Sequence, residues 1–177
     1  MMLLDTRRSI EFVAYGDPIP KGSTTRLPNG MTIDGAPSRS KDKAKRKAAN
    51  ARRKAWPVIV RDAAFEASGG EDVAPRDRMR LDGPLDVTAT FYLARPKNES
   101  RAERERIWHT NKPDIDKLLR GLLDPMKKAG AIAEDCRVAR VVVEKKYVEA
   151  LNGLTLQPMG AGRPRVVVRV VEMATTE

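Results

Sequence analysis

Residues 114–148 read DIDKLLRGLLDPMKKAGAIAEDCRVARVVVEKKYV, and this stretch decides the fold. Its first part predicts an amphipathic helix that ends at Gly130, because apolar side chains recur along one helix face. That apolar stripe consists of Ile115, Leu118, Leu119, Leu122 and Met126. Residues 138–148 are rich in valine and predict a strand. Residues 114–148 together form a unit that predicts a helix packed against a sheet.

Three further stretches outside this unit predict strands. Residues 85–93 alternate between apolar and polar side chains, as a strand with one buried face does. Residues 10–15 alternate in a similar way, and residues 165–171 are rich in valine. With residues 138–148 these segments give at least four strands.

The segments between the strands differ sharply in composition. Residues 38–67 are rich in alanine, lysine and arginine and predict helix, with Ser38 as its cap and Pro57 kinking it or dividing it into two pieces. Residues 23–37 contain glycine and proline and predict a loop. Residues 94–113 are polar and highly charged and predict a mobile loop.

The predicted order of elements is strand, long helix, strand, loop, helix, strand, strand. This order predicts the α+β class, with a mixed sheet of at least four strands and helices packed against it. A length of 177 residues favours a single domain, here residues 1–177.

The counts of reactive residues exclude several kinds of site. A single cysteine, Cys136, excludes a disulfide framework and cysteine-based metal clusters, and a single histidine, His109, excludes sites built from several histidines. No apolar run approaches the roughly 18 residues of a membrane span, and the N-terminal segment lacks the apolar core of a signal peptide. We therefore expect a cytoplasmic protein without membrane contact.

The positive charge of the chain is concentrated in one segment. The chain carries a net charge of +10, and residues 21–61 alone hold twelve Lys or Arg against two acidic residues. A neutral body with one basic segment is typical of a protein that binds the phosphates of nucleic acid. A solvated helix face without a ligand is the alternative. The candidate DNA-binding residues in this segment are Lys21, Arg26, Lys43, Lys45, Arg46, Lys47, Arg52 and Arg53.

Three carboxylates make a candidate metal site. Asp114 and Asp116 lie at the start of the predicted helix, and Asp135 precedes the valine-rich strand. If that strand packs beside the helix, Asp135 can return to the Asp114 end. Converging carboxylates suit a hard divalent cation, Mg²⁺ or Mn²⁺, which can activate water beside a scissile phosphate. In the alternative interpretation Asp114 is a helix cap, Asp116 pairs with Arg120, and the site is only structural.

The stretch KPDIDKLLRGLLDPMKKAGAIAEDCRV, residues 112–138, resembles the signature of the RusA-type Holliday junction resolvases. In that signature a K-P-D-x-D-N-L-x-K helix is followed by D-A-L and then by D-D-x-Q-V. The N-terminal GDPIPKGSTTR also resembles the G-x-P-x-P-K-G-R opening of the phage-borne branch of the family. The resemblance covers the order of elements over nearly the whole chain and is most specific over residues 111–147.

The resemblance implies a Mg²⁺-dependent endonuclease that acts as a homodimer and makes paired nicks in four-way DNA junctions. The family's three essential aspartates fall on Asp114, Asp116 and Asp135, and its basic residue near the metal falls on Arg120. If the chain is encoded by a phage, its location would be the bacterial host cytoplasm. The chain departs from the signature at Lys117, where the family usually has Asn, at Arg120, which replaces Lys, and at Cys136 and Arg137.

We therefore expect an endonuclease that resolves branched DNA, with the metal held by the three aspartates and the phosphate stabilised by Arg120. Two other hypotheses remain open: a non-enzymatic nucleic-acid-binding protein, and a metal nuclease for other branched DNA. Further candidate DNA contacts are Lys117, Lys145 and Lys146, which lie beside the metal-site elements in the sequence.

Overall fold

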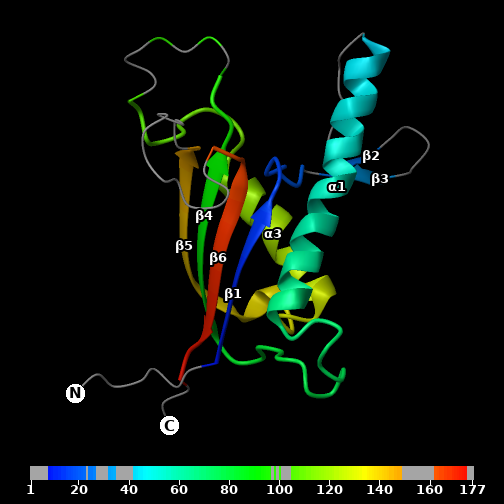
Figure 1. Cartoon of the computed structure of the whole chain (residues 1–177), viewed down its shortest axis with the longest axis vertical. Coiled ribbons are helices and arrows are strands. Elements are labelled where there is room, and N and C mark those ends of the chain that lie inside the picture. Colours follow the sequence, from blue (N-terminus) through cyan, green and yellow to red (C-terminus); the bar gives the residue numbers. More distant parts are fainter. Residues whose placement is uncertain are drawn as a thin grey trace.

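The computed structural model describes residues 8–22, 24–26, 32–34, 42–96, 98, 100, 105–148 and 162–174. Its main sheet has four strands in the order β1 (Ser9–Tyr15), β6 (Arg165–Glu172), β4 (Leu85–Leu93) and β5 (Val138–Tyr147). β4 and β5 run parallel, whereas β6 runs antiparallel to both β1 and β4. The predicted mixed sheet is confirmed (Figure 1).

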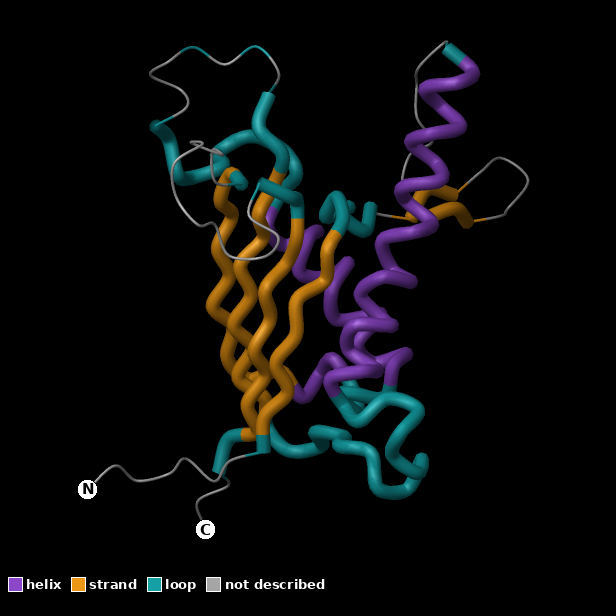
Figure 2. Tube along the Cα trace, in the orientation of Figure 1, coloured by secondary structure: helices purple, strands orange, loops and turns teal. Residues whose placement is uncertain are grey.

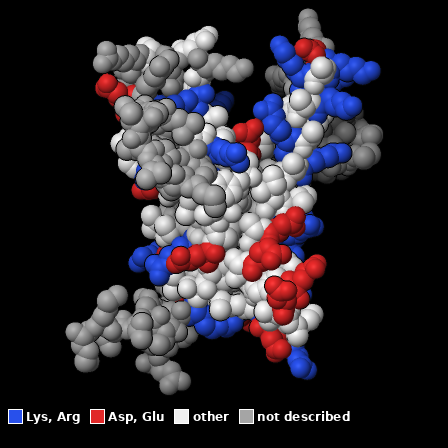
Figure 3. Space-filling view, in the orientation of Figure 1, with Lys and Arg blue, Asp and Glu red and all other residues white. Residues whose placement is uncertain are grey.

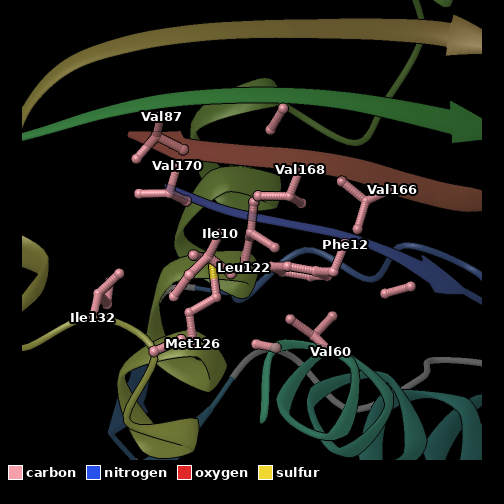
Figure 4. Packing of buried hydrophobic residues seen from close by; sticks show 14 of the residues in the cluster. Ile10, Phe12, Val60, Val87, Leu122, Met126, Ile132, Val166, Val168 and Val170 are labelled. Carbon is pink, nitrogen blue, oxygen red and sulfur yellow. The ribbon is translucent and has the colours of Figure 1, made fainter. Parts of the chain in front are cut away.

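Two long helices, α1 (Lys43–Ala67) and α3 (Ile115–Ala129), lie on one face of this sheet (Figure 2). This arrangement confirms the predicted α+β fold as a single domain. The core lies between the helices and the inward side chains of β1, β4 and β6 (Figure 4). Registered neighbours such as Val87 and Val170, or Phe12 and Val168, point to the same side, so the apolar alternation of each strand forms one continuous buried surface.

α3 matches its prediction closely. Leu118, Leu122 and Met126 are fully buried, whereas Ile115 at the first turn is exposed. Gly130 ends the helix in the left-handed conformation, with φ of 79°, in agreement with the prediction. The apolar stripe fixes which side of α3 meets the sheet, and it therefore also fixes which side carries the polar residues.

α1 differs from its prediction in two ways. It begins at Lys43, and its cap is Asp42, whose side chain accepts hydrogen bonds from the Ala44 and Lys45 amides. Ser38, the predicted cap, lies outside the described residues. The helix also continues through Pro57, so the prediction of two pieces is wrong. Trp56, Val60 and Ala64 are buried along one face across the proline, and this packing offsets the backbone hydrogen bond that proline cannot donate.

Two smaller elements are not predicted by any sequence pattern. β2 (Thr24–Arg26) and β3 (Thr32–Asp34) form a short antiparallel pair within the segment predicted as loop. A single 3₁₀ turn, η1 (Asp135–Arg137), precedes β5. None of the helices in the described part of the chain is long and apolar enough to cross a membrane.

The segment predicted as a mobile loop is tied down at its C-terminal part. The Tyr147 amide donates to the Ile107 carbonyl oxygen at 2.9 Å, and the His109 amide donates to the Lys145 carbonyl oxygen at 3.0 Å. These bonds place residues 107–109 along the last residues of β5, and the mobility of the segment remains a prediction. Positions 97, 99 and 101–104 lie outside the described residues.

Candidate active site and nucleic-acid interface

Asp114 occupies the N-cap position of α3 without acting as a side-chain cap. Its carboxylate accepts instead from the Lys117 ammonium at 2.8 Å. This hydrogen bond and the positive charge of Lys117 hold the pKa of Asp114 below its usual value, with smaller contributions from Lys112 and Lys145. The same pair raises the pKa of Lys117. Asp114 is therefore an exposed, ionised carboxylate at the start of the helix.

Asp116 and Arg120 are exposed on the first turns of α3, one turn apart. Among the described ion pairs, the Asp116–Arg120 pair of the alternative interpretation is absent and the Asp114–Lys117 pair takes its place. Asp114 and Asp116 together therefore present two hard oxygen donors at the N-terminal end of α3.

Asp135 lies at the other end of the same helix. Its neighbour Glu134 forms an ion pair with Lys127 in the last turn of α3. The hydrogen bond with Glu134 raises the pKa of Lys127, and the charges of Glu134 and Asp135 add to the rise. A helix of 15 residues is about 22 Å long, so Asp135 cannot reach Asp114 within one chain. In the part of the chain that the structure describes, no three His, Cys, Asp or Glu residues are grouped to hold a metal ion.

The expected return of Asp135 to the Asp114 end is thus wrong for a single chain, and the direction of β5 explains why. β5 starts with Val138 beside Leu85, at the C-terminal end of α3. Only its far end, at Lys145, comes back to the turn before Asp114. The assignment of the three aspartates and Arg120 as site residues remains a prediction.

Lys145 and Lys146, predicted DNA contacts, have partners within the protein. The Lys145 ammonium donates to the carbonyl oxygens of Asn111 at 2.6 Å and Pro113 at 2.7 Å, and thereby holds the turn that leads into Asp114. Lys146 pairs with Glu144 at 2.7 Å and lies over the ring of Trp108. No local pattern signals the role of Lys145, because the turn it holds is more than 30 residues away along the chain.

Lys21 is held against the middle of α3. Its ammonium forms an ion pair with Asp124, and its amide donates to the Lys117 carbonyl oxygen at 3.0 Å. Gly121 permits this contact, because a Cβ there would lie 2.9 Å from the Ile19 carbonyl oxygen. The side chain of Arg26, another predicted DNA contact, lies outside the described residues.

The basic residues of α1 are arranged along the half of the helix that extends beyond the sheet (Figure 3). Four of them, Lys43, Lys45, Arg46 and Lys47, are exposed. Arg52 pairs with Asp17 at 3.4 Å, and Arg53 is half-buried. This half of α1 is therefore a candidate surface for the phosphates of nucleic acid.

Comparison with known proteins places this site in a family. No curated protein matches the chain. A protein-family model described as endodeoxyribonuclease RusA matches residues 71–171. The matched region includes α3, η1, β4 and β5, and with them Asp114, Asp116, Arg120 and Asp135. The match covers more than half of the chain and includes the elements that carry these carboxylates. The chain therefore belongs to the RusA endodeoxyribonuclease family.

Proposed function

We propose that this protein is a structure-selective endodeoxyribonuclease that resolves four-way DNA junctions by paired nicks, in a Mg²⁺-dependent reaction. The observation that carries the proposal is the family match over residues 71–171. The exposed basic half of α1 supports it, because a junction is bound chiefly through its phosphates and shape. Arg120, exposed one turn after Asp116, would stabilise the charge on the cleaved phosphate.

Among the described residues, the carboxylates of one chain do not complete a magnesium site. Asp114 and Asp116 offer suitable oxygen ligands at one end of α3, but Asp135 lies about a helix length away. A junction with approximate two-fold symmetry calls for two equivalent sites and hence for a C2 homodimer. We include the homodimer in the proposal, since a second copy of the chain is a source of the missing carboxylate.

The principal experiment incubates a synthetic four-way junction with the protein in Mg²⁺ or in EDTA and separates the strands on a denaturing gel. We expect symmetric nicks with Mg²⁺ and none with EDTA. Asp114→Asn, Asp116→Asn and Asp135→Asn should each abolish cleavage and leave junction binding intact, because the phosphate contacts come from elsewhere. Junction binding that is equally tight in EDTA, with no cleavage in Mg²⁺, would favour the non-enzymatic binding protein instead.

A mixing experiment tests the homodimer. If each site takes Asp114 from one subunit and Asp135 from the other, a mixed dimer of the Asp114→Asn and Asp135→Asn variants has one site with both carboxylates intact. We expect the mixture to nick one strand, although each variant alone is inactive. A mixture as inactive as its components, under conditions in which subunits exchange, would contradict a shared site.

A further inference from the structure

A small cavity lies where the segment 19–22 crosses between α1 and α3, away from the Asp114 end of α3. Its volume is about 190 Å³. This is several times the roughly 30 Å³ share of one water molecule, yet below the roughly 300–1,000 Å³ of most small-molecule sites. The cavity therefore suits one group of a larger ligand. Its lining includes Lys21, Arg53, Trp56, Gly121, Asp124 and Lys128.

The charges around this cavity favour an anion. The Lys21 ammonium is paired with Asp124, so the only carboxylate among the described lining residues is already neutralised. Arg53 from α1 and Lys128 from α3 add two positive charges from opposite sides. A guanidinium and an ammonium are the groups that proteins most often present to phosphate oxygens.

Trp56 gives the same wall an apolar surface. Its side chain is buried, and its indole N–H is shielded from the cavity and has no hydrogen-bond partner among the described residues. A ligand in the cavity would therefore meet the ring of Trp56 rather than its N–H.

The cavity also has a fixed wall. The amide of Lys21 is bonded to the carbonyl oxygen of Lys117, and the absence of a side chain at Gly121 lets the segment 19–22 lie directly on α3. The cations around the cavity are thus held by two helices and a pinned segment. Such preorganisation lowers the entropy cost of binding a ligand.

We propose that this cavity binds one phosphodiester group of the DNA substrate, at a position distinct from the bond that is cut. The proposal rests on the proposed function and identifies where the substrate is gripped. Gly121 follows Asp114 by two helical turns, about 10 Å along α3. This separation exceeds the rise of one nucleotide, so the bound phosphate would be a different one from the phosphate at the cleaved bond.

The test scans a junction in which one phosphate at a time is replaced by an uncharged methylphosphonate, with affinity measured in EDTA so that no strand is cut. For the wild-type protein we expect one position, other than the cleavage site itself, where the replacement weakens binding about tenfold. In the double variant Arg53→Gln, Lys128→Gln, the same replacement should change affinity less than twofold, because this variant no longer holds the phosphate at that position.

The matched control is the double variant Lys54→Gln, Lys127→Gln, which removes the same charge from adjacent positions outside the cavity lining. This control variant should still bind the junction about tenfold more weakly when that one phosphate is replaced. An identical methylphosphonate profile in the wild type and the Arg53→Gln, Lys128→Gln variant would overturn the phosphate site alone. A wild-type protein that does not bind the junction at all would overturn the proposed function and, with it, this site.

Discussion

Lys145 holds the turn that positions the Asp114 carboxylate. It donates to two carbonyl oxygens in the turn before Asp114, and one of them belongs to the residue directly preceding Asp114. Lys145→Met removes both hydrogen bonds and should let this turn relax. A misplacement of about 1 Å at a reacting group can cost about 10²-fold in rate, so we expect single-turnover cleavage to fall by up to that factor with junction affinity unchanged.

The neighbouring residue provides the control for Lys145. Lys146 has the same charge, but its partners are Glu144 and Trp108. Lys146→Met should therefore leave the cleavage rate within about threefold of wild type. If Lys145 instead contacts DNA, Lys145→Met will weaken DNA binding. The slope of log affinity against log salt will then also fall by about 0.9.

His109 gives the fold a pH dependence that can be isolated, because it is the only histidine in the chain. Partial burial lowers its pKa below 6.5, and the positive charge of Lys145 lowers it further. Its ring packs on Tyr147 with a centroid separation of 4.7 Å, and its buried Nδ1 has no partner among the described residues. Neutral His109 is therefore the form that suits the native structure.

Proton binding by His109 decides whether the stability of the fold rises or falls with pH. Between the lowered folded pKa and the unfolded value of about 6.5, the unfolded chain binds more protons, so stability falls as the pH drops through this window. We expect the thermal midpoint of the wild type to fall from pH 7.5 to pH 5.5. His109→Phe, which keeps the ring packing, should show a smaller fall. Equal falls in both proteins would remove His109 as the cause.

Among the elements, those with a long periodic pattern can be predicted from sequence. The limits of β4 agree with the prediction residue for residue, since nine alternating positions leave little freedom of register. The β2–β3 pair escapes prediction because strands of three residues contain too few positions to show a period. The division of α1 at Pro57 is wrong because the packing of Trp56 and Val60 outweighs the local propensity of proline to end a helix.

The site is less predictable than the elements that carry it. The start of α3 can be located from Pro113 and the apolar stripe, which place Asp114 and Asp116 at its N-terminal end. The position of Asp135 depends on the parallel pairing of β5 with β4, a long-range property that no local pattern in residues 131–138 contains. The same holds for Lys21 and Lys145, whose partners are far away in the sequence.

The contact between α3 and the segment 19–22 gives a prediction for Gly121→Ala. Alanine favours helix over glycine by about 1 kcal/mol. The added Cβ, however, would lie 2.9 Å from the Ile19 carbonyl oxygen and 3.3 Å from the Lys21 nitrogen, and overpacking of this kind costs about 1–3 kcal/mol. We expect the clash to prevail and the free energy of unfolding, measured with urea, to fall. An increase would mean that the segment moves away easily.

On the scale of the whole molecule, the charge is separated along α1. The part that extends beyond the sheet carries mostly exposed lysines and arginines, whereas the C-terminal half of α1 carries both signs, with Arg61, Asp62 and Glu66 (Figure 3). Replacing Lys45, Arg46 and Lys47 by glutamine should weaken binding to every DNA tested. The slope of log affinity against log salt should drop by about 0.9 for each phosphate that these side chains neutralise in the wild type. An unchanged slope would identify this surface as a solvated helix face.

The pairing of β1 with β6 has a practical consequence for single-molecule work. Ser9 lies opposite Val171, and the Glu172 amide donates to the Arg8 carbonyl oxygen at 2.9 Å, so the first and last described segments leave the sheet side by side. Both leave from the end of the sheet opposite the basic half of α1 (Figure 1). A dye or surface tether attached beyond either β1 or β6 would therefore leave that half of α1 facing solution. A short peptide joining residues 8 and 174 could also close the chain into a ring, which would allow new ends to be opened elsewhere without breaking the β1–β6 pair.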